Sequence, residues 1–426
     1  MRNKVFLFLV AVLVVAGLIL GCAAPAPAPT PAPAPAPTPA PAPAPAPAKP
    51  FQWPSMLVVM AGGTTAPGYV IALSWTPLHE QDTGATWRVV GAASSAERMQ
   101  WLKDDKAQFY TTDMHTAGEE VSVGMGYETK VAGTMRYRIA WPCHTQSFGA
   151  CTFADSGIKT IKNIKPGTTF SVPTAAVTVM HFYHAFRRYL NMTEQQLLML
   201  SFASFEGAYR AFSQGQAKLV CTEPAGPSTI EWMSSPHGLT FLDWPEDKEA
   251  EARFREFLPD VPFAPVVMGP KEYLGIRMPA LLWFAIAKAE TDAEVIYRLV
   301  KWIDENNDRF KTRCIQCPFV TIQHLRNVAD VATVPFHEGT IRYLREKGMW
   351  TAADDARQEY NVWLNDQYIK AYTTAMKLGE QKGIQILPTN KEWVEFWKNY
   401  KKEIGIPPVK IMTDAEVKAA LAQIKK

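Results

Sequence analysis

The amino-acid sequence predicts an α/β fold of two lobes, followed by a helical extension at the carboxyl end. Short apolar runs alternate with amphipathic stretches over residues 56–112, which is typical of a parallel, doubly wound sheet. The same alternation starts again over residues 169–222, and two such units in series indicate two lobes with a cleft between them. From residue 352 onward the pattern is mostly helical. The body over residues 51–426 is also too long for one ordinary domain.

The amino terminus carries the pattern of an export signal. Arg2 and Lys4 precede an apolar run over residues 5–20, and Gly21 and Cys22 follow it. A basic start, a short apolar core and a small residue at the cleavage site are typical of a secretory leader. The order Ile-Leu-Gly-Cys resembles the bacterial lipobox, in which the cysteine becomes the lipidated first residue of the mature protein. We therefore expect a body outside the cytoplasm, anchored to the cell membrane by a lipid on Cys22. An uncleaved signal anchor and a plain cleaved leader are the alternatives.

The segment after this cysteine is a linker. Residues 23–48 are almost pure Ala-Pro. Because proline fixes φ and lacks an N–H, the tract extends as polyproline II at about 3.1 Å per residue. This predicts a semi-rigid stalk of roughly 80 Å if fully extended.

The first α/β unit begins with a strand-to-helix junction. A buried apolar run leads directly into Gly62-Gly63-Thr64-Thr65, and Pro67 stands where a helix would begin. The strands expected in this unit cover residues 56–61, 87–90 and 108–112, and the helix between the last two opens at Ser94 and Ser95.

The second unit repeats the plan. Pro173-Thr174 follows a short strand and would open a helix over residues 175–190. Thr193 and Gln196 form a capping-box pattern ahead of a short helix, and Ser204 opens another helix that Gly215 ends. The strands expected here cover residues 169–172 and 218–222, with a further strand emerging over residues 197–202.

The rest of the chain returns to the first lobe and then becomes helical. Residues 281–287 are apolar enough to be a buried strand that returns between the lobes. Thr291 and Glu294 form a capping-box pattern for the helix that follows, and Thr413 with Glu416 form another near the carboxyl end. The domains expected are a lipoprotein signal peptide over residues 1–21, the anchor cysteine and linker over 22–50, lobe 1 over 51–140 and 276–350, lobe 2 over 141–275, and the helical extension over 351–426.

Charge and hydropathy exclude two classes of partner. The formal net charge is +3, and it falls to about +1 (3 − 2) once Arg2 and Lys4 leave with the leader. No basic block stands out, which argues against nucleic acid as a partner. Beyond the leader no apolar run approaches the length of a membrane-spanning helix, so the body is expected to have none.

Five cysteines follow the lipobox cysteine. An oxidising exterior permits disulfides, and the pairs closest in sequence, Cys143/Cys151 and Cys314/Cys317, are the ones expected to form. Cys221 is then left without a partner. The Cys-Ile-Gln-Cys motif could instead be a redox dithiol or half of a metal site, although a single such pair is weak evidence for either.

Three segments, in order, resemble those of a known family. They are the glycine turn Gly62-Gly63-Thr64-Thr65 with Tyr69 after it, residues 154–165 (Ala-Asp-Ser-Gly-Ile-Lys-Thr-Ile-Lys-Asn-Ile-Lys), and residues 335–348 (Pro-Phe-His-Glu-Gly-Thr-Ile-Arg-Tyr-Leu-Arg-Glu-Lys-Gly). Together they resemble the TAXI family of solute receptors for TRAP transporters, over roughly residues 55–350. The third segment is the most specific of the three.

The resemblance implies a receptor with the two-lobed, Venus-flytrap fold of periplasmic binding proteins. Such a receptor closes on a small solute outside the cytoplasm and delivers it to an integral-membrane TRAP permease that is driven by an ion gradient. Members whose ligands are known bind small carboxylates such as glutamate. No cofactor and no metal site are expected.

Matching by position places the ligand-binding candidates at three turns. Relatives usually have a loop rich in glycine and serine at the turn of lobe 2, where this chain has Val-Pro-Thr-Ala-Ala, so fewer backbone N–H groups can wrap an oxygen closely. Glu97-Arg98 likewise replaces neutral residues, and both departures point away from glutamate itself. The candidates are Gly62, Gly63, Thr64, Thr65, Tyr69, Ser94 and Ser95 in lobe 1, and Pro173, Thr174, Ala175, Ala176 and Thr178 in lobe 2.

The residues support a carboxylate site independently of the family. Two helix N-termini, near Pro67 and Thr174, would face one another across the cleft, and each offers unpaired N–H groups and a partial positive charge. In open α/β sheets the ligand crevice lies at the carboxyl ends of the strands, where these turns lie. Arg98, Arg136 and Arg138 are candidates for a charge-assisted clamp, with solvated surface positions as the alternative.

Enzymatic activity is not expected. The sequence has no nucleophile elbow, Walker loop or dinucleotide-binding glycine pattern. His181 and His184 lack a His-Glu-x-x-His context and are interpreted as ordinary residues of an amphipathic helix. Cys143 and His144 would point to opposite faces of a strand. An anchored extracytoplasmic hydrolase is the alternative of a different class, and a sensor or an ABC-importer receptor of the same fold is the nearer one.

Overall fold

A computed structural model describes residues 51–63, 66–92, 94–124, 126–130, 133–174 and 176–425. The leader, Cys22 and the Ala-Pro linker lie outside these residues, so the signal peptide, the lipid anchor and the stalk stay predictions. Within the described part of the chain, no helix combines the length and the apolar character that crossing a membrane requires.

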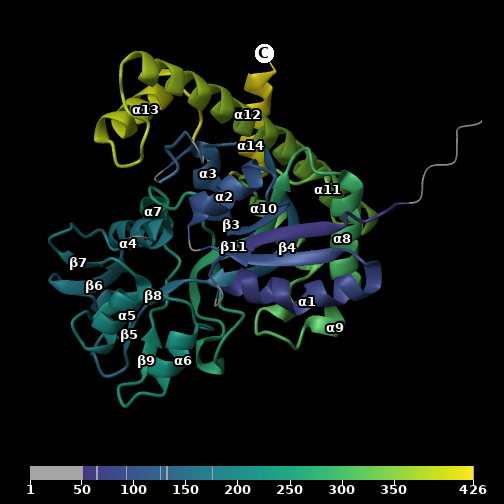
Figure 1. Cartoon of the computed structure of the whole chain (residues 1–426). Helices are drawn as coiled ribbons and strands as arrows, with labels where there is room; N and C mark the ends of the chain where they lie inside the picture. Colours follow the sequence, from purple (N-terminus) through teal and green to yellow (C-terminus); the bar gives the residue numbers. More distant parts are fainter. Residues whose placement is uncertain are drawn as a thin grey trace, which may run out of the picture. The chain divides into compact units, whose positions relative to one another are not determined.

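Lobe 1 is built on a mixed sheet (Figure 1). Its strands are β1 (Met56–Ala61), β2 (Thr86–Gly91), β3 (Phe109–Asp113), β4 (Tyr137–Ser147), β10 (Phe263–Pro265) and β11 (Arg277–Lys288). They follow the order β10-β11-β3-β1-β2, with β4 also paired to β11. β1 is parallel to β2 and β3, whereas β11 runs antiparallel to β3, β4 and β10. The predicted parallel unit of three strands is therefore confirmed.

The helices of lobe 1 begin where the local sequence allows a cap. Pro67 occupies the first turn of the first helix, and the side chains of Ser94 and Asp113 cap the next two. The helix after β11 is capped by Asp292 rather than by the predicted Thr291. The helices are α1 (Pro67–Thr83), α2 (Ser95–Lys103), α3 (Met114–Ser122), α8 (Ala293–Glu305), α9 (Asn307–Phe310), α10 (Ile322–Val331) and α11 (Glu338–Glu346).

Lobe 2 is built on a second sheet. Its strands are β5 (Gly149–Phe153), β6 (Thr168–Pro173), β7 (Leu197–Phe202), β8 (Leu219–Thr222) and β9 (Leu239–Phe241), in the order β7-β6-β8-β5-β9. β6 is parallel to β7 and β8, and β5 runs antiparallel to β8 and β9. The helices are α4 (Val177–Tyr189), α5 (Phe205–Ser213), α6 (Pro227–Met233) and α7 (Lys248–Phe254).

One predicted element of lobe 2 is wrong. The segment from Thr193 to Gln196 is a turn that leads directly into β7, and not a short helix. The Gln196 side chain does accept a hydrogen bond from the Thr193 N–H at 2.8 Å, as in a capping box. Pairing of Leu197–Phe202 with β6 ends the turn before a helix can propagate.

The chain crosses between the lobes twice. It leaves lobe 1 between β4 and β5, around Phe148, which is later than the predicted boundary after residue 140. It returns through β10 and β11, so residues 281–287 form the predicted returning strand. Each lobe has its own buried apolar core, and Trp283 packs against both cores. The predicted two-lobed α/β fold is confirmed.

The helical extension is also confirmed, and it packs on lobe 1. Its helices are α12 (Ala352–Gln381), α13 (Lys391–Glu403) and α14 (Asp414–Ile424). The indole N–H of Trp393 donates to the carbonyl of Glu128 at 3.0 Å, and that of Trp397 donates to the carbonyl of Val123 at 2.9 Å. These fully buried tryptophans fasten the extension to the segment that follows α3. The Ile411 N–H also bonds the Pro259 carbonyl at 3.1 Å, so the extension reaches a loop of lobe 2 as well.

One of the two predicted disulfides is present. Cys314 and Cys317 are bonded, whereas Cys143, Cys151 and Cys221 are free and buried. The predicted Cys143–Cys151 pair is wrong because the two cysteines belong to different cores, Cys143 to that of lobe 1 and Cys151 to that of lobe 2. The crossing between β4 and β5 separates them.

Candidate functional site

The carboxyl ends of the parallel strands bring the predicted turns to one edge of each sheet. In lobe 1, Gly62 follows β1, Ser94 follows β2, and Asp113 ends β3. In lobe 2, Thr174 follows β6 and Glu223 follows β8. Strand ends of this kind form the ligand crevice of open α/β sheets.

The glycine turn leaves the start of α1 without a side-chain cap. Ala66 is the N-cap residue and makes no side-chain hydrogen bond, and its N–H donates to the Gly63 carbonyl at 2.7 Å. A Cβ on Gly62 would lie 2.6 Å from the Cβ of Ala66, so the tight turn requires glycine there. Tyr69 lies half-buried in the first turn of α1. Thr64 and Thr65 lie outside the described residues.

The serine turn is braced by its own arginine. The Ser94 hydroxyl accepts a hydrogen bond from the Glu97 N–H at 3.3 Å. Arg98 is buried, and it donates to the Ala92 carbonyl at 2.6 Å and to the Ser95 hydroxyl at 2.8 Å. These bonds tie the guanidinium to the turn between β2 and α2, so Arg98 stabilises this turn. Its contact with a ligand stays a prediction.

Arg136 and Arg138 lie against the helical extension. Arg136 pairs with Asp366 of α12 at 2.8 Å, and Arg138 donates to the Asn365 side chain of the same helix at 3.2 Å. Both guanidinium groups therefore contact α12, which gives them a role in attaching the extension.

The turn of lobe 2 differs from its prediction at the helix start. Thr174 does not cap α4, because its N–H and its hydroxyl both donate to the Phe202 carbonyl, at 2.7 and 3.1 Å. Ala176 is the N-cap residue and offers no side-chain cap, so α4, like α1, begins without one. Pro173 is buried at the end of β6, Thr178 is half-buried on α4, and Ala175 lies outside the described residues.

A β-bulge at the crossing places a histidine that the sequence did not single out as a ligand contact. Thr145 pairs with Leu282 and Pro142 pairs with Phe284, so Cys143 and His144 together oppose one residue of β11. That residue is Trp283, and its ring stacks on His144 with centroids 6.0 Å apart. Bulges of this kind redirect side chains and are frequent beside binding sites.

The side chains around this bulge carry polar atoms that lack a partner in the part of the chain that the structure describes. Among the described residues, neither ring nitrogen of His144, nor the Trp283 indole nitrogen, nor Oε1 of Gln146 has a hydrogen-bond partner. His144 is fully buried, and burial lowers its pKa to about 3, so the imidazole is neutral. Buried polar groups are almost always bonded, and each exception calls for a partner such as a ligand or water.

Glu223 is a further residue that the sequence reasoning missed. It directly follows β8, and its Oε2 atom is buried with no partner within the described chain. Burial raises the pKa of this carboxyl to about 7. The sequence did contain a signal for this residue. An acidic side chain directly after a buried strand, and before Gly226-Pro227, lies at a strand end, and strand ends line the ligand crevice of open α/β sheets.

Two further features bear on the chemistry of the chain. Burial raises the pKa of the Cys143 thiol, which disfavours the thiolate that a nucleophile would need. A hollow of about 310 Å³ lies between α12 and α13, and its lining includes Trp363 and Tyr400. It belongs to the helical extension and none of the predicted site residues lines it.

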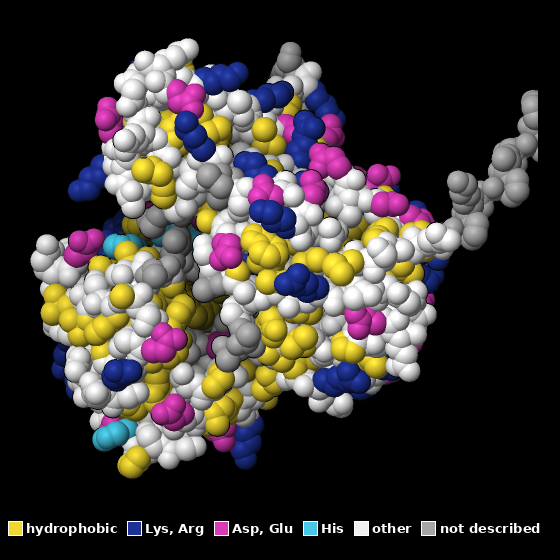
Figure 2. All heavy atoms as spheres, viewed as in Figure 1, with side chains coloured by type: hydrophobic (Ala, Val, Ile, Leu, Met, Phe, Trp, Pro, Cys, Tyr) yellow, Lys and Arg dark blue, Asp and Glu magenta, His cyan; other side chains and the backbone are white. Residues whose placement is uncertain are grey.

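Figure 2 shows charged side chains of both signs scattered over the face in view, without a block of one sign.

The sequence comparison identifies the family. The profile of the NMT1-like family matches residues 60–348, which is more than half of the chain. The chain belongs to the NMT1-like family. The match includes both lobes, ends before the helical extension, and covers every predicted ligand-binding residue. No curated protein matches the chain.

Three solved structures with a distant likeness to this NMT1-like protein illustrate what the search found. The periplasmic VFT2 domain of BvgS from Bordetella pertussis has 13% identity and a TM-score of 0.38, over 61% of this chain and 92% of that domain. The substrate-binding domain 2 of GlnP from Lactococcus lactis, in an open conformation, has 10% identity and a TM-score of 0.37, over 64% and 97%. ArgBP from T. maritima, as a mutant, has 10% identity and a TM-score of 0.36, over 60% and 91%.

Proposed function

We propose that this NMT1-like protein is an extracytoplasmic solute receptor that holds one small solute between its two lobes. The observation that carries the proposal is a set of polar atoms at the β4–β11 bulge that have no hydrogen-bond partner among the residues the structure describes. His144, Gln146 and Trp283 offer an imidazole, an amide oxygen and an indole N–H on the strand pair next to the crossing. A bound solute would satisfy these atoms, and the stacked rings of His144 and Trp283 would provide an apolar wall.

A small carboxylate is the solute class that fits best. The N-cap residues of α1 and α4, Ala66 and Ala176, make no side-chain cap, so the partial positive charge of each helix start remains available to an anion. At α4 this includes the first N–H groups, whereas α1 begins with Pro67, which has no N–H, and its Tyr69 N–H donates to the Ala66 carbonyl at 3.0 Å. The buried carboxyl of Glu223 would suit the ammonium group of an amino acid, or would donate a hydrogen bond in its neutral form. Closure of the lobes around such a solute is the expected working motion.

The finer assignment is that of a lipid-anchored receptor for a TRAP permease. It is supported by the resemblance of the glycine turn, residues 154–165 and residues 335–348 to TAXI receptors, and by the lipobox pattern at Cys22. A gene for a large permease with many membrane spans beside this gene would support the TRAP role, whereas neighbouring ABC ATPase genes would favour an ABC importer.

A ligand panel tests the proposal. The full chain, purified in detergent, is heated with amino, keto and aromatic acids, and one class should raise its melting temperature. A solute present at 100 times its Kd stabilises the folded state by about 2.7 kcal/mol. If no acid of the panel shifts the transition, the carboxylate assignment fails.

Two substitutions at the bulge locate the binding site. Trp283→Phe keeps an aromatic ring, although a smaller one, and removes the N–H. Loss of one hydrogen bond to a charged oxygen should weaken binding by roughly tenfold or more. His144→Ala should weaken it further. His237→Ala is the matched control, because His237 is exposed in lobe 2, where its ring bonds Asp155 at 2.6 Å and lies against the ring of Phe153. Unchanged affinity in both bulge variants would place the solute elsewhere.

A further inference from the structure

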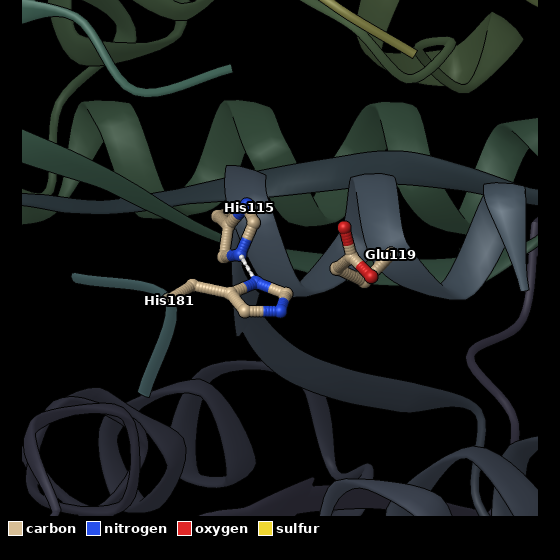
Figure 3. Close-up of side chains that lie close together, drawn as sticks. All are labelled: His115, Glu119 and His181. Atoms are coloured by element: carbon tan, nitrogen blue, oxygen red, sulfur yellow. Dashed lines mark hydrogen bonds between the residues drawn. The ribbon is translucent and has the colours of Figure 1, made fainter. Parts of the chain in front are cut away.

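A cluster of two histidines and a glutamate lies apart from the bulge and joins the two lobes. His115 and Glu119 are one helical turn apart on α3, whose buried residues belong to the core of lobe 1. His181 lies on α4, whose buried residues belong to the core of lobe 2. One ligand atom from each of the three side chains lies within 4.8 Å of the other two. Figure 3 shows the two imidazoles in contact, with the Glu119 carboxylate beside them.

The distance between the two imidazoles is close to that of a metal site. Nε2 of His115 and Nδ1 of His181 are 3.0 Å apart. Two nitrogens bound to one tetrahedral zinc ion, at about 2.0–2.1 Å each, lie roughly 3.3 Å from one another. The ring nitrogens therefore have to separate by only a few tenths of an ångström. Both rings also have to turn so that their lone pairs converge on one ion, and the Glu119 carboxylate, within 4.8 Å of both nitrogens, has to approach it. The ion would take the place of the proton that the nitrogens share.

A carboxylate supports the first of these histidines from behind. Asp260 lies 2.7 Å from Nδ1 of His115, and both side chains are almost fully buried. A histidine that binds a metal usually donates its other ring N–H to a carboxylate, which orients the ring and raises its basicity. Because Asp260 holds Nδ1 of His115, Nε2 lies on the side of His181 and is the atom that would bind the ion.

Two glycines of this region make room for the carboxylates. A Cβ on Gly118 would lie 2.3 Å from Oδ2 of Asp260, so only glycine allows Asp260 to reach α3. A Cβ on Gly124 would lie 1.7 Å from Oε2 of Glu119. The backbone of α3 and of the segment after it is thus shaped around both acidic groups.

We propose that His115, His181 and Glu119 bind a divalent transition-metal ion, with Zn²⁺ as the best match. Two imidazoles and one carboxylate suit zinc, whereas Ca²⁺ and Mg²⁺ prefer sites made of oxygen atoms. Three protein ligands leave a fourth position for water or for an oxygen of a solute. Because the ligands come from both lobes, the bound ion fastens α3 to α4. The metal site does not depend on the proposed solute.

Zinc titration of the full chain tests this site. The chain is purified in detergent, stripped with EDTA, freed of chelator, and titrated with Zn²⁺ by calorimetry. We expect one ion per chain, and His181→Ala should weaken its binding at least 100-fold. His184→Ala is the matched control, because His184 lies one turn further along α4, is only partly buried, and does not belong to the cluster. The absence of stoichiometric binding, or equal affinity in the His181 variant, would overturn the proposal.

Two further variants separate metal binding from folding. Glu119→Gln leaves both histidines and Asp260 in place, and Asp260→Asn removes only the supporting carboxylate. We expect Asp260→Asn to weaken zinc affinity about 10–100-fold, as such partners do elsewhere. Substitution with Co²⁺ supplies a visible absorption spectrum of a four-coordinate site, which should be present in the parent chain and altered in Glu119→Gln. If near-UV circular dichroism shows both variants folded and neither changes affinity or spectrum, the site is not a metal site.

Discussion

The buried carboxyl of Glu223 makes a quantitative prediction about stability and pH. Burial raises its pKa from 4.5 to about 7. The folded state therefore binds the proton more tightly than the unfolded state, and the slope of unfolding free energy against pH is negative between these two values. One pKa unit corresponds to 1.36 kcal/mol, so about 3 kcal/mol of stability should be lost as the pH rises from below 4.5 to 8.

Glu223→Gln removes this titration while it keeps the shape of the side chain. Urea unfolding of the parent chain and of the variant, followed by tryptophan fluorescence at pH 5, 6, 7 and 8, measures the difference between them. The variant should gain about 2–3 kcal/mol relative to the parent chain across this range, because the amide never carries a charge into the buried site. Glu231→Gln on the neighbouring helix α6 is the control, since Glu231 is exposed.

A difference between parent and Glu223→Gln that stays constant from pH 5 to pH 8 would refute the reasoning. It would mean that the carboxyl of Glu223 reaches water or an unrecognised donor in the folded chain. A pH-dependent difference that disappears when a bound amino acid is present would instead identify the ammonium group as its partner.

Two other predictions concern a close approach and the anchor. Gly118→Ala should destabilise the chain by about 1–3 kcal/mol, because its Cβ would displace the carboxylate of Asp260. Gly207→Ala, also within a helix but with its nearest neighbour 3.5 Å from the new Cβ, should instead stabilise by up to about 1 kcal/mol, and thermal unfolding of both variants measures the contrast. Cys22→Ala should release the body from the membrane fraction of cells, and continued sedimentation with membranes would contradict the lipid anchor.

The strands and most helices could be predicted because their signals are local. Buried strands such as Met56–Ala61 are short apolar runs, and helix starts such as Ser94 and Thr413 carry their own caps. Predictions failed where a neighbouring strand or a more suitable cap took precedence. No helix follows Thr193, because the next residues pair with β6 as a strand, and Asp292 rather than Thr291 caps α8.

The sequence by itself determined the repeated α/β units, the helical extension, and the turns at the strand ends, because periodicity and capping depend on residues close together in the chain. The tertiary structure decided which polar side chains meet. His144 and Trp283 meet only because β4 pairs with β11 through a bulge, and His115 meets His181 only because two lobes come together. Contacts between residues so far apart in the chain leave no periodic trace in a single sequence. The metal and solute sites proposed for this protein therefore depend on its folded arrangement.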